Sequence, residues 1–317
     1  MDIVEEIKKE RPSISEGTIK AYTSNLRKLH EKITGKKDIE NLDFLKSPDV
    51  VLEKIDKLLT NTQKNYLVAV VVILQTNKTK YKDLIEIYQK KIKNMQEAVN
   101  DKYDENEKSS KQANNWADYQ DILKLLKKLK KETKPLLEKD PENLTQKEKD
   151  LIQNYLVVYL YSGKAFPIIR NDFADMKIVN ESDERDDDKN YFVVKKKGLP
   201  FFQLNEFKTK KYQGEKIIPI KDLELRKLIN KWAKITNTGY LLINVSNNSP
   251  MKANGISKYL QKIYLKNLNK KISTSLLRSI FITNKYDKNM SQKEKKNLAE
   301  NMGHSKNTAE QVYNKIN

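Results

Sequence analysis

The chain has 317 residues and a formal net charge of +19 at pH 7. It contains no cysteine and two histidines, His30 and His304, which excludes disulfides, thiolate catalysis, cysteine-ligated zinc and histidine-rich metal sites. The longest apolar run, residues 66–74, is too short to span a bilayer, and the N-terminus lacks the basic and apolar regions of a signal peptide. The sequence therefore predicts an intracellular, soluble protein, outside the membrane, with a polyanionic partner such as nucleic acid.

The first hundred residues are predicted to form a helical bundle. Ser13 and Glu16 fit a capping box that opens one helix, and a second is expected to begin at Pro48. Two more are expected around residues 66–74 and 81–100. Four helices of this length make a compact domain. Basic residues recur on its polar faces: Lys20, Arg27, Lys28, Lys36, Lys37 and Lys64. They fit two interpretations, contact with DNA and a surface that is only solvated.

Residues 101–112 are polar and charged without apolar periodicity, so they are predicted to link two domains. The second domain, residues 113–317, is expected to be mostly helical with one small antiparallel sheet, which makes the whole chain mainly α. An acidic loop at 181–188 is expected to be a solvated turn rather than a metal site. The expected helices span 117–133, 146–162, 223–235, 253–268, 273–287 and 292–301, and the expected strands span 176–179, 191–194, 201–204 and 216–220.

Arginine is the informative charged residue, because lysine is abundant while the chain has only six arginines: Arg11, Arg27, Arg170, Arg185, Arg226 and Arg278. Two of them, Arg170 and Arg278, lie in apolar stretches of the second predicted domain. One interpretation is a buried structural role, with Arg170 paired to Asp172 or Asp175. The other is functional, because two guanidinium groups can hold the oxygens of a phosphate as its charge develops.

Three further residues extend this pattern. Lys208 is expected at a strand end, where a hairpin can aim its ammonium at a leaving oxygen. Gly303 is placed to stop a helix before His304, and residues 307–308 are placed to cap a short helix that carries Tyr313. A tyrosine oxygen is a competent nucleophile when a neighbouring group orients it. The plainer interpretation is a core histidine, a packing tyrosine and one lysine among many.

Arginine after a helix, lysine on a hairpin, arginine on a core helix, Gly-His and a tyrosine nine residues later form an order that resembles the tyrosine recombinases, or phage-type integrases. The resemblance covers residues 116–313, and the preceding bundle is similar to the family's core-binding domain. The Pro-x-x-Arg-Asn-Asp-Phe form at 167–173 and Lys-Gln-x-x-Asn-Trp at 111–116 look most similar to recombinases of large DNA viruses and their satellites. A viral origin would place the protein in the cytoplasm or nucleus of a host cell.

The resemblance implies an α+β catalytic domain in which Tyr313 attacks the scissile phosphate and forms a 3′-phosphotyrosyl link. Arg170 and Arg278 would hold the non-bridging oxygens, and Lys208 would protonate the leaving 5′-oxygen. His304 would donate a hydrogen bond to the phosphate or position the tyrosine. Neither a metal nor a nucleotide cofactor is implied, because the covalent intermediate retains the bond energy. The implied partners are double-stranded DNA, further copies of the chain in a tetramer on paired sites, and an accessory directionality protein.

The chain departs from the family pattern around both arginines. Ser275 stands three residues before the second arginine, where the family usually has a histidine or lysine that accepts the tyrosine proton, and serine is a poor base. Phe173 stands where an acidic residue is common, and Asp172 is its acidic neighbour. Ser275 and Asp172 are therefore expected to be supporting residues.

The C-terminal region departs in length. The segment between the second arginine and Gly-His is longer than usual, with the insertion expected within residues 285–296. Related recombinases often lend a C-terminal segment to a neighbouring protomer, and only residues 314–317 follow Tyr313 here. We expect either a further C-terminal segment or regulation of Tyr313 by the mobility of its own helix.

Three functions fit these residues. The first is a site-specific recombinase or integrase, whose two basic domains would enclose duplex DNA. The second is a nicking-closing enzyme similar to type IB topoisomerases, with the same chemistry but without strand exchange. The third is a non-catalytic basic DNA-binding protein whose site is degenerate at Ser275.

Overall fold

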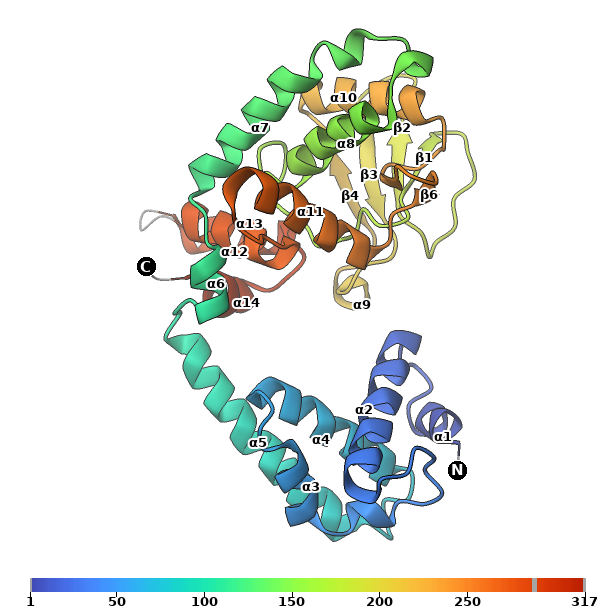
Figure 1. Ribbon diagram of the computed structural model, residues 1–317, viewed down its shortest axis with the longest axis vertical. Coiled ribbons are helices and arrows are strands. Elements are labelled where there is room, and N and C mark those ends of the chain that lie inside the picture. Colours follow the sequence, from blue (N-terminus) through green and yellow to red (C-terminus); the bar gives the residue numbers. More distant parts are fainter. Residues whose placement is uncertain (1, 287–289, 316–317) are drawn as a thin grey trace. The chain divides into compact units, whose positions relative to one another are not determined.

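The computed structural model describes residues 2–286 and 290–315 (Figure 1). The chain divides into two compact units, Met1–Glu105 and Asn106–Asn317, each with its own hydrophobic core. The residues expected to form a linker are helical at both ends, because one helix continues to Asp104 and the next begins at Ser110. None of the described helices is long and apolar enough to cross a membrane.

The N-terminal unit is helical, and its central helix is α4 (Thr60–Gln75), which packs against α2 and α5. The apolar residues from Leu67 to Leu74 cover most sides of the helix, as is typical of a helix that is buried all round. The remaining elements are α1 (Ile3–Glu10), α2 (Glu16–Thr34), the 3₁₀ turn η1 (Asp43–Leu45), α3 (Pro48–Ile55) and α5 (Lys82–Asp104).

Two local predictions for this unit need correction. The N-cap of α2 is Ser15, whose hydroxyl accepts from the Thr18 amide at 3.3 Å, so the capping box predicted for Ser13 and Glu16 is wrong. Helix α1 was not expected; it is amphipathic and buries only Ile3 and Ile7, which is too few apolar residues for its periodicity to stand out.

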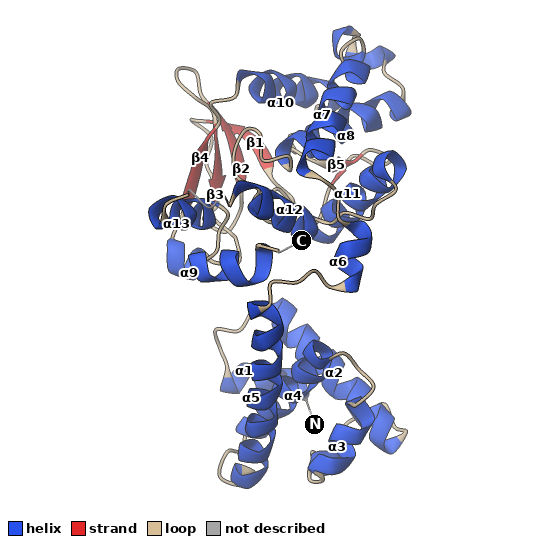
Figure 2. Cartoon of the chain, turned by 90° about the vertical axis from the view of Figure 1, so that its left-hand side faces the viewer, coloured by secondary structure: helices blue, strands red, loops and turns tan. Residues whose placement is uncertain are grey.

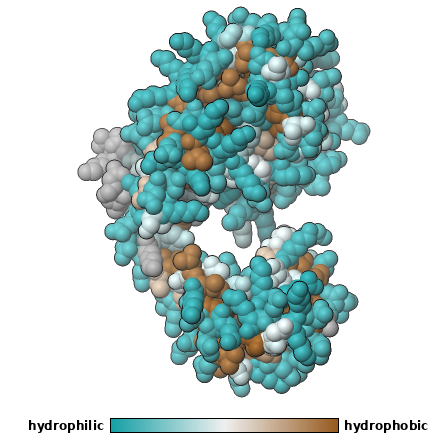
Figure 3. Space-filling view, in the orientation of Figure 1, coloured by the Kyte–Doolittle hydropathy of each residue, from teal (hydrophilic) through white to brown (hydrophobic). Residues whose placement is uncertain are grey.

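The second unit combines helices with a sheet that stands to one side of them (Figure 2). Its face in Figure 3 is largely hydrophilic, with smaller apolar patches. Helices α8 and α12 are its most buried long helices, and they pack against α7 and α11. The helical elements are α6 (Ser110–Asn115), α7 (Tyr119–Thr133), η2 (Leu136–Glu138), η3 (Pro141–Asn143), α8 (Gln146–Leu160), α9 (Lys210–Gln213), α10 (Leu223–Thr236), α11 (Ala253–Leu268), α12 (Thr274–Lys285), α13 (Gln292–Asn301), α14 (Lys306–Thr308) and the π-helical turn η4 (Ala309–Tyr313).

The main sheet is mixed, so the prediction of an antiparallel sheet is wrong. Its order is β1-β2-β3-β4, with β1 parallel to β2 and the other pairs antiparallel. The strands are β1 (Lys177–Asn180), β2 (Tyr191–Val194), β3 (Phe201–Leu204) and β4 (Lys216–Pro219); β5 (Ile243–Asn244) and β6 (Ser249–Pro250) form a separate pair. Alternating burial predicts a strand but not its direction. The acidic loop at 181–188 crosses back along the sheet, so that β2 runs parallel to β1.

Asn190 holds the end of that loop by four hydrogen bonds. Its side-chain Nδ2 donates to the carbonyls of Asp172 and Glu206 at 2.9 and 2.8 Å, and its Oδ1 accepts from the backbone amides of Asn205 and Glu206. These bonds place the start of β2 beside both the segment after Arg170 and the end of β3. The strand directions therefore depend on contacts between distant residues.

The segment that carries Arg170 is packed onto the sheet by aromatic residues. Phe173 lies edge-on to Phe202 of β3, with ring centroids 5.0 Å apart, and Phe166 lies 5.6 Å from the same ring. The Tyr161 hydroxyl donates to the Arg170 carbonyl at 3.1 Å. The backbone at Arg170 is thus held from both sides.

The expected helix at 273–287 ends at Lys285. Residues 287–289, where that helix was expected to finish and part of the insertion was expected to lie, are outside the described residues.

Candidate active site

Four of the predicted residues, Arg170, Arg278, His304 and Tyr313, meet at the turn after α13. Gly303 has φ +78, a left-handed conformation that favours glycine. Its carbonyl accepts from Nη1 of Arg170 at 2.6 Å and from Oγ1 of Thr209 at 3.2 Å. A Cβ at this position would lie 3.2 Å from Arg170 Nη1, so a larger residue would press on the arginine as well as strain the backbone.

Arg278 reaches the same turn from α12, and its side chain is 1% exposed. Its Nη1 donates to the carbonyls of Ile168 and Met302 at 2.8 and 3.0 Å. Its Nε and Nη2 are buried and have no hydrogen-bond partner among the described residues. Burial lowers the pKa of Arg278 and the neighbouring Tyr313 acts against this fall, yet a guanidinium keeps its proton at any ordinary pH. A buried cation with unused donors is costly unless an acceptor arrives.

His304 and Tyr313 stack on one another beside this arginine. Their ring centroids lie 4.9 Å apart with the planes inclined by 16°, and Cζ of Arg278 lies 4.9 Å from the centre of the Tyr313 ring. Tyr313 ends the π-helical turn η4 and is half-buried. The short helix before it is capped by Ser305, not by residues 307–308 as predicted, because the Ser305 hydroxyl accepts from the Thr308 amide.

His304 is neutral at neutral pH. Burial and then the charge of Arg278 lower its pKa to about 4. Its Nδ1 lies 3.2 Å from the Ser305 carbonyl, which can only accept, so Nδ1 carries the proton. Nε2 is then the lone-pair nitrogen; it is buried without a partner among the residues that the structure describes.

The structural interpretation expected an ion pair between Arg170 and Asp172 or Asp175, and the part of the chain that the structure describes contains neither pair. The Arg170 side chain donates to Gly303, while Asp175 lies 2.9 Å from Nζ of Lys252. Burial raises the pKa of Asp172, although the positive charges of Arg170 and Arg278 act against this rise. Asp172 is thus a buried carboxyl group on which the charges of both arginines act.

Lys208 precedes Thr209, whose side chain contacts the turn after α13. Lys208 is exposed in the turn between β3 and α9, four residues past the end of β3, so its predicted position at a strand end is wrong. The chain continues past the strand because Asn205 and Phe207 are buried and hold the turn against the unit. The next residue, Thr209, bonds the Gly303 carbonyl and tethers the backbone of Lys208 to the site.

Lys216, the first residue of β4, was missed. Its Nζ donates to the carbonyls of Glu300 and Asn301 at 3.0 and 2.6 Å. Burial lowers its pKa to about 8, with Asp172, Arg278 and Arg170 among the charges that act on it. The alternation of β4 was an available signal, because Lys216 and Ile218 share the less exposed face of the strand.

Ser275 and Tyr313 line one cavity of about 530 Å³ beside α6 and α12. Ser275 is exposed there, so the phenol and the serine share a polar, open space. Lysines and amides of α6, of α11 and of the segment before α12 are also among the lining residues: Lys111, Gln112, Asn115, Gln261 and Lys271. Ser275 therefore borders the same cavity as the nucleophile candidate, but a serine hydroxyl does not replace a basic group.

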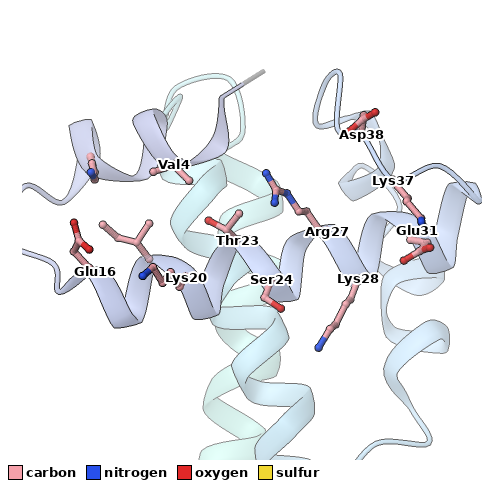
Figure 4. A pocket seen from close by; sticks show the side chains of 12 residues that line it. Val4, Glu16, Lys20, Thr23, Ser24, Arg27, Lys28, Glu31, Lys37 and Asp38 are labelled. Carbon is pink, nitrogen blue, oxygen red and sulfur yellow. The ribbon is translucent and has the colours of Figure 1, made fainter. Parts of the chain in front are cut away.

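The N-terminal unit has a separate cavity of about 710 Å³ along α1 and α2 (Figure 4). Basic side chains outnumber acidic ones in it. Four of the basic residues singled out in the sequence line it: Lys20, Arg27, Lys28 and Lys37. The acidic lining residues are Glu16, Glu31 and Asp38, so the charge of this surface is mixed.

Within residues 2–286 and 290–315, no group of three histidine, aspartate or glutamate side chains is placed to hold a metal ion. Searches of protein-family models and of curated proteins find no match to this chain.

Proposed function

We propose that this chain is a DNA strand transferase of the tyrosine-recombinase type. The Tyr313 oxygen attacks a backbone phosphate, forms a 3′-phosphotyrosyl bond and releases the 5′-hydroxyl; a 5′-hydroxyl then attacks the same phosphorus and frees the tyrosine. The observation that carries the proposal is the buried Arg278, whose Cζ lies 4.9 Å from the centre of the Tyr313 ring and whose Nε and Nη2 have no hydrogen-bond partner within the described residues.

A phosphate is the ligand that best suits this arrangement. Arg278 has three N–H donors left over after its two carbonyl bonds, and they belong to a planar fork that matches two oxygens. Arg170 approaches the same turn and adds a second positive charge. A purely structural arginine in so buried a position would be expected to use all its donors.

The protons of this reaction need a donor and an acceptor. Lys208, exposed and tethered through Thr209, protonates the leaving 5′-oxygen. The phenol proton leaves to water in the cavity that Tyr313 shares with Ser275. His304 is a poor acceptor because a group with a pKa of about 4 does not retain a proton at neutral pH. Its ring instead orients the tyrosine by stacking.

A nicking-closing enzyme would use the same steps, so the recombinase assignment rests on the N-terminal unit. That unit is a separate helical body, and its α2 presents Lys20, Arg27 and Lys28 along one cavity (Figure 4). These side chains suit contacts with DNA phosphates. Exchange of strands between two labelled duplexes supports the recombinase, whereas relaxation of supercoiled DNA without exchange supports the nicking-closing enzyme.

The decisive experiment traps the covalent intermediate. Because the target sequence is unknown, the substrate is a pool of random-sequence duplexes with one nick in each, so that the short cleaved fragment diffuses away. A 5′ label on the cleaved strand is expected to stay with the protein on a denaturing gel, and a 3′ label is expected to be released.

Tyr313→Phe is expected to bind the pool and form no adduct, while Tyr212→Phe, at a tyrosine that is 85% exposed, serves as the control. An adduct that persists in Tyr313→Phe would contradict the nucleophile assignment. Absence of any adduct in the wild type, together with retained DNA binding, would favour the non-catalytic DNA-binding protein.

A further inference from the structure

Lys216 joins the sheet to the turn on which the candidate active site is built. Its ammonium donates to the carbonyls of Glu300 and Asn301, in the last turn of α13. The final carbonyls of a helix have no partner within the helix and carry the negative end of its dipole, so a cation there is stabilising. A lysine reaching them from another element fastens the helix end to the sheet.

The residues that follow this helix end belong to the site. The His304 amide donates back to the Ala299 carbonyl at 3.1 Å, and the Gly303 carbonyl accepts from Arg170 and Thr209. A shift of the last turn of α13 would therefore move the acceptor of Arg170 and the ring that stacks on Tyr313. The two lysine bonds act directly on that turn.

We propose that Lys216 is a positioning residue for strand cleavage: its ammonium fixes the carbonyl end of α13, and thereby keeps the Gly303 carbonyl and the His304 ring in register with Arg170 and Tyr313. This inference rests on the proposed function for its catalytic consequence, but the positioning itself is a property of the fold. Lys216 acts through the turn, whereas Lys208 remains the proton donor.

The burial of Lys216 makes its role sensitive to pH. Burial lowers its pKa to about 8; Asp172 and Glu300 favour the charged form, whereas Arg278 and Arg170 oppose it. His304 feels the same positive charge. Loss of the Lys216 proton weakens both bonds to α13, because charge-assisted hydrogen bonds are the stronger kind. An arginine in its place keeps its charge over the whole range.

The test compares Lys216→Met and Lys216→Arg with Lys221→Met, which removes an exposed lysine just after the same strand. Single-turnover cleavage of the nicked pool is measured between about pH 6.5 and 9.5, since an ammonium with an ordinary pKa near 10.5 would not titrate there. Lys216→Met is expected to slow cleavage roughly tenfold to a hundredfold, as small misplacements of reacting groups do. Its affinity for DNA is expected to stay close to that of Lys221→Met.

Lys216→Arg is expected to cleave at a rate close to that of the wild type below pH 8. Above pH 8 the wild type loses its Lys216 proton, so the ratio of the wild-type rate to the Lys216→Arg rate is expected to fall. A wild-type to Lys216→Arg ratio that is flat with pH, or a Lys216→Met rate equal to that of Lys221→Met, would overturn the proposal. If thermal unfolding shows that Lys216→Met does not fold, the pH dependence of the wild-type rate relative to the Lys216→Arg rate still tests the proposal.

A second readout is independent of catalysis. Backbone amide exchange across residues 299–305 reports the order of the turn, including the His304 amide. Faster exchange in Lys216→Met, but not in Lys216→Arg or Lys221→Met, supports the positioning role even if the wild type forms no adduct. Unchanged exchange in Lys216→Met would refute the positioning role, whether or not the protein cleaves DNA.

Discussion

The imidazole of His304 lies flat against the phenol of Tyr313, with ring centroids 4.9 Å apart. The stacked pair is closed on a third side by the Arg278 guanidinium, whose Cζ lies 4.9 Å from the tyrosine ring centre. The nucleophile candidate is therefore held by one neutral ring and one cation. This arrangement restrains the tyrosine ring without requiring a strong base in contact with its hydroxyl.

The neutral state of His304 predicts how the second unit responds to acid. Its pKa in the folded protein is about 4, below the ordinary value of 6.5. The folded state therefore prefers the neutral ring, so its contribution to stability is complete above about pH 6.5 and is lost as the pH falls through about 4. The free energy of unfolding of the wild type, minus that of His304→Gln, should therefore decrease as the pH is lowered from about 6.5 to about 4, as measured by denaturant unfolding. A difference that stays constant with pH would contradict the lowered pKa.

Arg278→Lys tests the guanidinium fork separately from its charge. Lysine keeps the positive charge but lacks the planar pair of donors, so stabilisation of the phosphate oxygens should be lost. We expect single-turnover cleavage to slow by roughly a hundredfold, or about 3 kcal/mol, as for removal of one oxyanion donor. Arg226→Lys is the matched control, because Arg226 also has a buried Nε without a partner in the described part of the chain. Equal rates for the two variants would remove the phosphate role from Arg278.

If Lys208 is the proton donor, as we propose, a better leaving group should restore cleavage when this lysine is removed. Lys208→Met should cleave an ordinary duplex slowly, but a duplex with a bridging 5′-sulfur should be cleaved nearly as fast as by the wild type, because a thiolate leaves without a proton. The exposed Lys208 side chain also implies that this variant keeps its unfolding temperature. Lys211→Met, at a nearby exposed lysine, is the control. If sulfur does not restore the rate, the proton donor is another group.

Gly163 tests the packing that supports the site. It has φ +71, and a Cβ there would overlap the ring of Phe281 on α12, which is 2% exposed and packs edge-on to Tyr119. Gly239 has the same φ but nothing within 4 Å of such a Cβ. Gly239→Ala should therefore cost about 1 kcal/mol for its backbone alone. Gly163→Ala should cost a further 1–3 kcal/mol, roughly, for the overlap.

Thermal or denaturant unfolding of the two alanine variants measures this difference directly. Equal losses would mean that Phe281 moves aside without cost, and that the contact between the end of α8 and α12 is looser than its burial implies.

The sequence predicted the helices well wherever apolar residues recur at helical spacing. Helix α11 spans Ala253–Leu268, which are the residues expected. Helices α8 and α13 also begin where expected, because their capping residues, Thr145 and Ser291, bond the first turn locally. Local bonds of this kind are encoded in consecutive residues, so one sequence suffices to locate them.

The sequence also supplied the residue types of the candidate site in their order along the chain, from Arg170 to Tyr313. What it determined was which side chains are chemically able to hold a phosphate and attack it. The hypothesis of a tyrosine recombinase rests on that order, and the trapping experiment is its test.

Only the tertiary structure decided how these side chains meet. The burial of Arg278, the ring of His304 against Tyr313 and the reach of Lys216 to α13 each depend on elements far apart in the chain. The parallel pairing of β1 with β2 likewise depends on the bonds of Asn190 to distant carbonyls. The physical reason is that periodicity records which face of an element is buried, whereas the partner on that face is selected by the packing of the whole unit.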